Sequence, residues 1–138
     1  MSLSHFLLIL LFSLGSFGQS WSTQTVIECT SNDLQSYNSV KINYVKRMSS
    51  FYTITLGNTL SPRWSFETFI SKPYWNGTSV VALYQSQSDG MDIKFIFIPA
   101  SGNSFVSVNS KKKPSINTPP QGRKDMICKL LAPELIEK

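Results

Sequence analysis

Short segments in which apolar and polar residues alternate are the feature that most limits how this chain can fold. In residues 39–47, apolar Val40, Ile42 and Tyr44 alternate with polar Lys41 and Asn43. A period of two places the apolar side chains on one face of a β-strand, whereas a helix would need a period near 3.6. Further segments that read as strands are residues 51–56, 64–70, 78–84, 91–98 and 105–108.

Turn-forming residues separate these segments at positions 61–62, 76–77, 89–90 and 99–103. Six to seven short strands divided by such turns predict an all-β fold, namely an antiparallel β-sandwich, cup or barrel. The length of 138 residues fits one domain, with a core large enough for the chain to fold without several disulfides.

The most specific local signal is the Asn-Gly pair at positions 76–77. Both residues accept the positive φ angles of a type I′ turn, so residues 64–74 and 78–84 are predicted to pair as a hairpin. Pro73 lacks a backbone N–H, which favours an edge strand or a short connection in the first arm.

The first 18 residues have the character of a secretory signal peptide. Residues 6–12 form an unbroken apolar run, followed by small residues up to Gly18 and then by polar residues. The run is too short to cross a bilayer, which takes about 20 apolar residues. We therefore predict a signal peptide over residues 1–18 and a single secreted, extracellular β domain over residues 19–138. In a secreted protein the sequon that begins at Asn76 is a candidate glycosylation site.

Cleavage after Gly18 would remove His5, the only histidine in the chain. Nucleophile–imidazole catalysis and the usual zinc sites are then nearly closed to the mature protein. Catalysis would depend on carboxylates, lysines or tyrosines, and the available carboxylates are Asp89 and Asp92 or Glu67. A hairpin turn explains the Asp89 and Asp92 pair more simply, because Asp-Gly, here at positions 89–90, is common in such turns. We predict no enzymatic activity, no metal site and no cofactor.

Cys29 and Cys128 are the only cysteines, and they stand 99 positions apart. An even pair in an exported chain predicts a disulfide, with two free thiols as the alternative. The bridge would close a loop of nearly the whole domain and join the first strand to the last element. The chain-entropy model gives such a loop roughly 4–5 kcal/mol of stability.

The net charge of +5 is concentrated in residues 109–125, which hold five bases and one acid. We predict that this proline-rich stretch is a long basic loop. It could contact an anionic surface, such as a glycosaminoglycan or acidic lipid headgroups, or be a solvated loop without a partner. Its candidate residues are Lys111, Lys112, Lys113, Arg123 and Lys124. Nucleic acid is not an expected partner of an exported protein. The following residues 126–131 fit either a final strand or a short helix.

Aromatic residues are frequent in the predicted strands. They either fill a packed core or line an apolar cavity between two separated sheets. The candidates to line such a cavity are Trp64, Phe66, Phe69, Phe95, Phe97 and Phe105. The sequence alone does not distinguish a filled core from a hollow one.

Three segments resemble small secreted insect proteins related to the ganglioside-activator-like lipid-recognition fold, including families linked to contact chemosensation. They are Gly57-Asn-Thr-Leu60, the Trp64-x-Phe-x-x-Phe-Ile70 segment, and residues 74–84. The likeness covers residues 29–108 and lies in pattern more than in identity. It implies a β-cup that holds a lipid or another hydrophobic signal molecule.

Two functional hypotheses follow from these patterns. The first is a secreted, non-enzymatic protein that binds a lipid or other small hydrophobic ligand and does not span a membrane. The alternative is an extracellular protein-interaction domain with a filled core, such as a signalling antagonist or an immune or reproductive factor. The volume of an apolar cavity would discriminate between the two, because the absence of a sizeable one favours the interaction domain.

Overall fold

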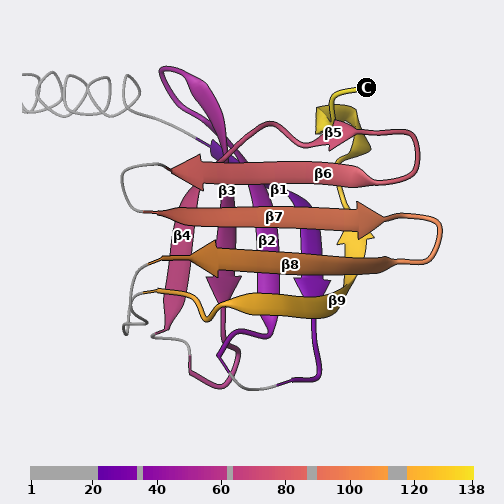
Figure 1. Cartoon of the computed structure of the whole chain (residues 1–138). Helices are drawn as coiled ribbons and strands as arrows, with labels where there is room; N and C mark the ends of the chain where they lie inside the picture. Colours follow the sequence, from indigo (N-terminus) through magenta and orange to yellow (C-terminus); the bar gives the residue numbers. More distant parts are fainter. Residues whose placement is uncertain (1–21, 34–35, 62–63, 87–89, 112–117) are drawn as a thin grey trace, which may run out of the picture.

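The computed structural model describes residues 22–33, 36–61, 64–86, 90–111 and 118–138 (Figure 1). The signal-peptide prediction lies outside these residues. Strands dominate the described chain, as the all-β prediction requires, and no helix in it is long and apolar enough to cross a membrane. The elements are β1 (Ser22–Thr30), β2 (Ser39–Lys46), β3 (Ser50–Gly57), β4 (Ser65–Ile70), β5 (Tyr74–Trp75), β6 (Val80–Ser86), β7 (Met91–Ile98), β8 (Asn103–Ser110), β9 (Gly122–Leu130) and the 3₁₀ helix η1 (Pro133–Leu135).

The nine strands form one antiparallel sheet in the order β4-β3-β2-β1-β9-β8-β7-β6-β5. The sheet curls into a half-barrel, so β6 to β9 run crosswise in front of β1 to β4 (Figure 1). The two layers are therefore halves of a single sheet, continuous through the pairing of β1 with β9. On the opposite side, the Ser71 N–H donates to the Leu83 carbonyl at 2.9 Å and ties the end of β4 to β6.

The core fills the space between the two halves of the sheet. Alternate residues of each strand point inward, as the period of two predicts. Ile42 and Ile54 from the rear half, and Phe95 and Val106 from the front half, are completely buried. Burial of these side chains provides the hydrophobic driving force that holds the two halves of the sheet together.

The count of six to seven strands was too low, because β1 and β5 lack a clear alternating pattern. In β1 a register shift between Thr25 and Ile27 leaves the neighbours Val26 and Ile27 both buried. Such a bulge interrupts the period of two. Strand β5 has only two residues.

The hairpin predicted at Asn76 exists, but its first arm is much shorter than expected. Only Tyr74 and Trp75 pair with β6, whereas residues 65–70 pair with β3 on the other half of the sheet. Asn76 lacks the positive φ that a type I′ turn needs, and Gly77 has φ 107°. Pro73 separates the two segments, in agreement with the short connection that its missing N–H favours.

The basic loop is also shorter than the sequence predicted. Strand β8 extends to Ser110, and β9 begins at Gly122, so residues 122–125 belong to the sheet. They pair with β8, for example Arg123 with Ser107. Residues 126–131 continue this strand as far as Leu130 and do not form a helix. Residues 112–117 lie outside the described chain.

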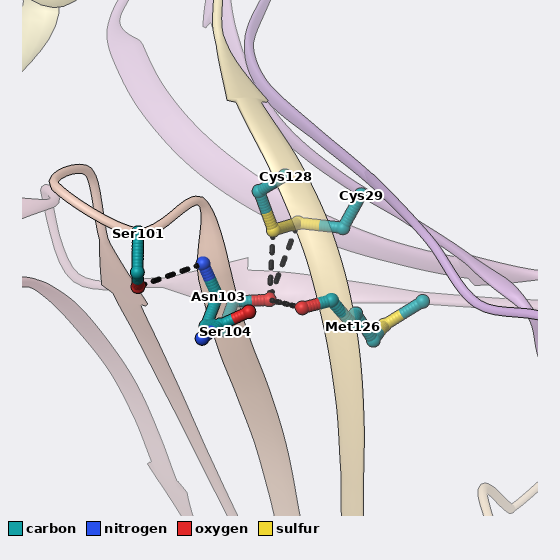
Figure 2. The surroundings of a disulfide bond; sticks show 6 residues. All are labelled: Cys29, Ser101, Asn103, Ser104, Met126 and Cys128. Atoms are coloured by element: carbon teal, nitrogen blue, oxygen red, sulfur yellow. Dashed lines mark hydrogen bonds between the residues drawn. A yellow bond between two sulfur atoms is a disulfide. The ribbon is translucent and has the colours of Figure 1, made fainter.

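The predicted disulfide between Cys29 and Cys128 is confirmed. The two residues lie directly opposite each other on β1 and β9, where the two halves of the sheet meet. Ser104 of β8 lies beside the bond, with its Oγ 2.7 Å from Cys128 Sγ (Figure 2). The same hydroxyl donates to the Met126 carbonyl oxygen at 3.3 Å. The bridge therefore reinforces the seam between the halves.

Candidate functional site

The six aromatic residues proposed to line a cavity are divided between the two faces of the sheet. Phe69 is 63% exposed on the outer face of β4, and Phe105 lies on the outer face of β8 with the Arg123 guanidinium 4.0 Å from its ring centroid. Those that are buried in the core or pack against it are Trp64, Phe66, Phe95 and Phe97. The fold therefore brings four of the six together, and they contribute to a packed interior.

A mainly apolar pocket of about 390 Å³ opens at one end of the half-barrel, and we call it the mouth pocket. Its lining residues come from β5, β6, β9, the β7–β8 turn and the C-terminal segment. They are Trp75, Val80, Pro99, Leu130, Pro133, Ile136 and Lys138. Lys138 is the one charged residue among these seven.

The mouth pocket continues the interior of the sheet toward solvent. Trp75 is paired with Val80, and Val80 with Phe97, so the three side chains share the inner face. Val80 and Phe97 are buried, whereas Trp75, at the end of the two-residue strand, is 42% exposed. The indole therefore lies at the solvent-exposed edge of the pocket.

The C-terminal segment forms a fixed wall of the mouth pocket. The Ala132 N–H donates to the Val26 carbonyl of β1 at 3.2 Å, and the Tyr52 hydroxyl donates to the Leu135 carbonyl at 3.2 Å. The Trp75 N–H donates to the Glu137 carbonyl at 2.8 Å. These bonds to three strands hold Pro133 and Ile136 against the pocket. No local pattern in the sequence predicts this wall, because residues distant along the chain meet there.

A second depression, of about 600 Å³, lies on the outer face of β8 and β9, and we call it the outer groove. Phe105 and Ile127 contribute apolar surface, and Asn32 and Asn103 contribute amides. Arg123 and Asp125 form an exposed ion pair at 2.9 Å within this lining. The outer groove is thus more polar than the mouth pocket and is separated from the core by the sheet.

The bases proposed to contact an anionic surface do not form one described patch. The Lys124 side chain is only 12% exposed and pairs with Asp33 at 3.3 Å, while its ammonium lies 4.4 Å from the Tyr37 ring centroid. Arg123 points to the opposite face of β9, into the outer groove. Lys111 is exposed beside Gly90, and Lys112 and Lys113 lie outside the described residues.

Asp92 and Glu67, the two described acidic residues considered for catalysis, lie on β7 and β4, in different halves of the sheet. Asp92 is exposed on β7, and Asp89 lies outside the described chain. Glu67 on the outer face of β4 accepts hydrogen bonds from Thr53 at 3.3 Å and Thr55 at 2.9 Å. Within the described ranges, no three His, Cys, Asp or Glu side chains gather as a metal site. Asn76 is exposed in its turn, where its Oδ1 accepts a hydrogen bond from the Ser79 N–H at 2.9 Å.

Among the described residues, Tyr37 is the one buried titratable side chain whose pKa differs greatly from its ordinary value. It is buried next to Trp64, whose ring is parallel to it at a centroid distance of 6.4 Å. Burial raises the pKa of Tyr37 to about 12, because the phenolate would lose its hydration.

This shift predicts an alkaline loss of stability. The unfolded chain releases the Tyr37 proton near pH 10, before the folded chain does, so the free energy of unfolding falls as pH rises from about 10 to 12. We expect Tyr37→Phe to show a shallower loss than wild type over this range in urea titrations. The control is Tyr74→Phe at an exposed position, and an equal loss in wild type and Tyr37→Phe would contradict the assignment.

Comparisons with known proteins add no relative: no family model, curated protein or solved structure matches the chain significantly.

Proposed function

We propose that this chain is a secreted, non-enzymatic protein that binds a small hydrophobic molecule in the mouth pocket. The observation that carries the proposal is an apolar pocket that extends the core to the surface and ends at the half-exposed Trp75. Its volume of about 390 Å³ falls in the range of small-molecule sites. The resemblance of residues 29–108 to lipid-recognition proteins supports the same class of ligand.

The lining of the mouth pocket also indicates the chemistry of the ligand. Six of the seven lining residues offer apolar or aromatic surface, and Lys138 offers a single ammonium group. An amphiphile with one acidic or neutral polar end, such as a long-chain carboxylic acid, would satisfy both. A ligand with several charges would leave them without partners.

The chain offers a matched pair of variants to test the mouth pocket. Tyr74 and Trp75 are neighbours on β5 with exposed fractions of 38% and 42%, but only Trp75 belongs to the pocket lining. We expect Trp75→Ala to weaken binding of a long-chain carboxylic acid at least tenfold, because the site loses its aromatic wall. Tyr74→Ala should bind like wild type. Isothermal titration and native mass spectrometry of protein secreted from eukaryotic cells would measure both.

Equal binding by the two variants would place the ligand elsewhere. Wild-type protein that binds no acid in titration and carries no co-purified lipid would overturn the proposed function. The same preparation tests secretion, because the position of its N-terminus shows whether the signal peptide was removed. A change in mass after glycosidase treatment would show a glycan at the exposed Asn76.

A second candidate function is an extracellular protein-interaction domain, and the outer groove is the observation that favours it. Ile98 and Ile127 are exposed there beside the Arg123–Asp125 ion pair. Apolar residues surrounded by polar ones are typical of protein-binding surfaces. A chain that binds no amphiphile but retains this groove would fit the second function.

A further inference from the structure

The connection between β2 and β3 presents an exposed methionine between polar residues. Strand β2 ends at Lys46 and β3 begins at Ser50, so Arg47, Met48 and Ser49 form the tip. In Figure 1 this purple loop at the upper left extends past β6. Met48 is 99% exposed. Transfer of an unbranched apolar side chain from water to an apolar environment is favourable, because it lowers the free energy of the system.

Aromatic contacts on both faces stiffen the hairpin just below its tip. On the inner face, Tyr44 and Tyr52 have ring centroids 5.1 Å apart, and the Tyr44 hydroxyl lies 3.0 Å from Ser50 Oγ. On the outer face, Phe51 and the exposed Phe69 of β4 make an edge contact at 5.1 Å. These contacts hold the tip on a stiff hairpin, and the aromatic rings form apolar surface next to it.

In the strand segments and the turn at this end of the sheet, every charged residue is a base. Residues 22–24, 44–52 and 69–72 contain the bases Lys46, Arg47 and Lys72 and no acidic residue. Glu137 lies near the inner side of the hairpin base: the pKa of Tyr52 is raised first by burial, then by Tyr44 and by this carboxylate. The tip beyond that base thus combines an apolar side chain with adjacent positive charge.

We propose that the tip of the β2–β3 hairpin binds the surface of bilayers that contain anionic lipid. Met48 enters the boundary between headgroups and acyl chains, while Lys46 and Arg47 remain among the lipid phosphates and carboxylates. Phe51 and Phe69 then approach the headgroup region, which aromatic side chains favour. The positive net charge of the chain favours the same kind of surface. This surface is separate from the mouth pocket and does not depend on the ligand proposed there.

The test is flotation of the protein, purified after secretion from eukaryotic cells, with vesicles of phosphatidylcholine alone or mixed with phosphatidylserine. We expect binding only to the mixed vesicles, and weaker binding at higher salt because counterions screen the bases. Each base near an anionic membrane contributes about fivefold in affinity, so the double variant Lys46→Ser, Arg47→Ser should lose more than tenfold. Met48→Ser should lose severalfold, because it removes the inserted group and keeps the charge.

Two matched variants separate the tip from nonspecific effects. Leu60→Ser removes a side chain that is 67% exposed beyond the opposite end of β3. The double variant Lys94→Ser, Lys129→Ser lowers the net charge by the same two units at exposed positions on β7 and β9. Both should bind the mixed vesicles nearly as wild type does.

Several results would overturn the proposal. Equal losses in the tip variants and their matched controls would mean that total charge or general hydrophobicity causes binding. No binding of wild type to the mixed vesicles would exclude the surface directly. Salt-sensitive retention on heparin without vesicle binding would assign the bases to an anionic polysaccharide.

Discussion

Replacing Cys29 and Cys128 together with alanine will lower the free energy of unfolding by about 4–5 kcal/mol. The bond closes a loop with a sequence separation of 99 residues, and its removal returns that conformational freedom to the unfolded chain. The location adds to the effect, since β1 and β9 share only the four register pairs from Ile27 to Thr30. Without the bond, the seam keeps only this short pairing and the hydrogen bonds from the Leu131 and Ala132 N–H groups to the Val26 carbonyl among its described backbone links between β1 and β9.

Urea unfolding of the double variant, followed by circular dichroism, would measure this loss. Ser104→Ala is the control: it removes the hydroxyl beside the sulfur atoms but keeps the disulfide, and should cost about 1 kcal/mol through the lost hydrogen bond. If the double variant does not fold, unfolding of wild type with and without a reducing agent gives the same comparison. A loss no larger than that of Ser104→Ala would contradict the expected role of the bridge.

The strands that the sequence predicted well are those with one buried and one solvated face. Strands β2 and β7 are examples, because Lys41 and Lys94 are exposed between buried neighbours. The first part of β9 was not predicted as a strand, because Lys124 lies on its inner side, an unusual place for a base. Its ammonium reaches the Tyr37 carbonyl and Asp33, and this partnership depends on the fold.

The candidate site was harder to predict than the fold. The aromatic residues proposed for a cavity belong to strong strands, so their pattern indicated burial without showing which interior space remains open. The mouth pocket instead uses Pro99, Leu130 and Ile136, whose neighbourhood depends on how the C-terminal segment is fastened to β1 and β5. The hairpin tip had a local signal, since Met48 follows two bases between two predicted strands. That signal becomes informative only once the exposure of the methionine is known.

Replacing Phe95 with alanine will lower the free energy of unfolding by about 3–5 kcal/mol, the usual cost of removing a fully buried phenylalanine. Phe95 is completely buried on β7, paired with Ala82 on one side and Val106 on the other. The deleted ring would leave a void that these small neighbours cannot fill. Urea unfolding of ligand-free protein measures the loss.

The matched control for Phe95→Ala is Phe69→Ala, which removes an equal ring from the outer face of β4. Because Phe69 is largely exposed and has the Phe51 ring as its described aromatic contact, its removal should cost about 1 kcal/mol. Similar small losses in both variants would mean that the interior behind Phe95 is already hollow, so that a ligand could extend from the mouth pocket into the core. A large loss only at Phe95 would confine the ligand to the mouth pocket, since close-packed side chains leave no room behind Val80.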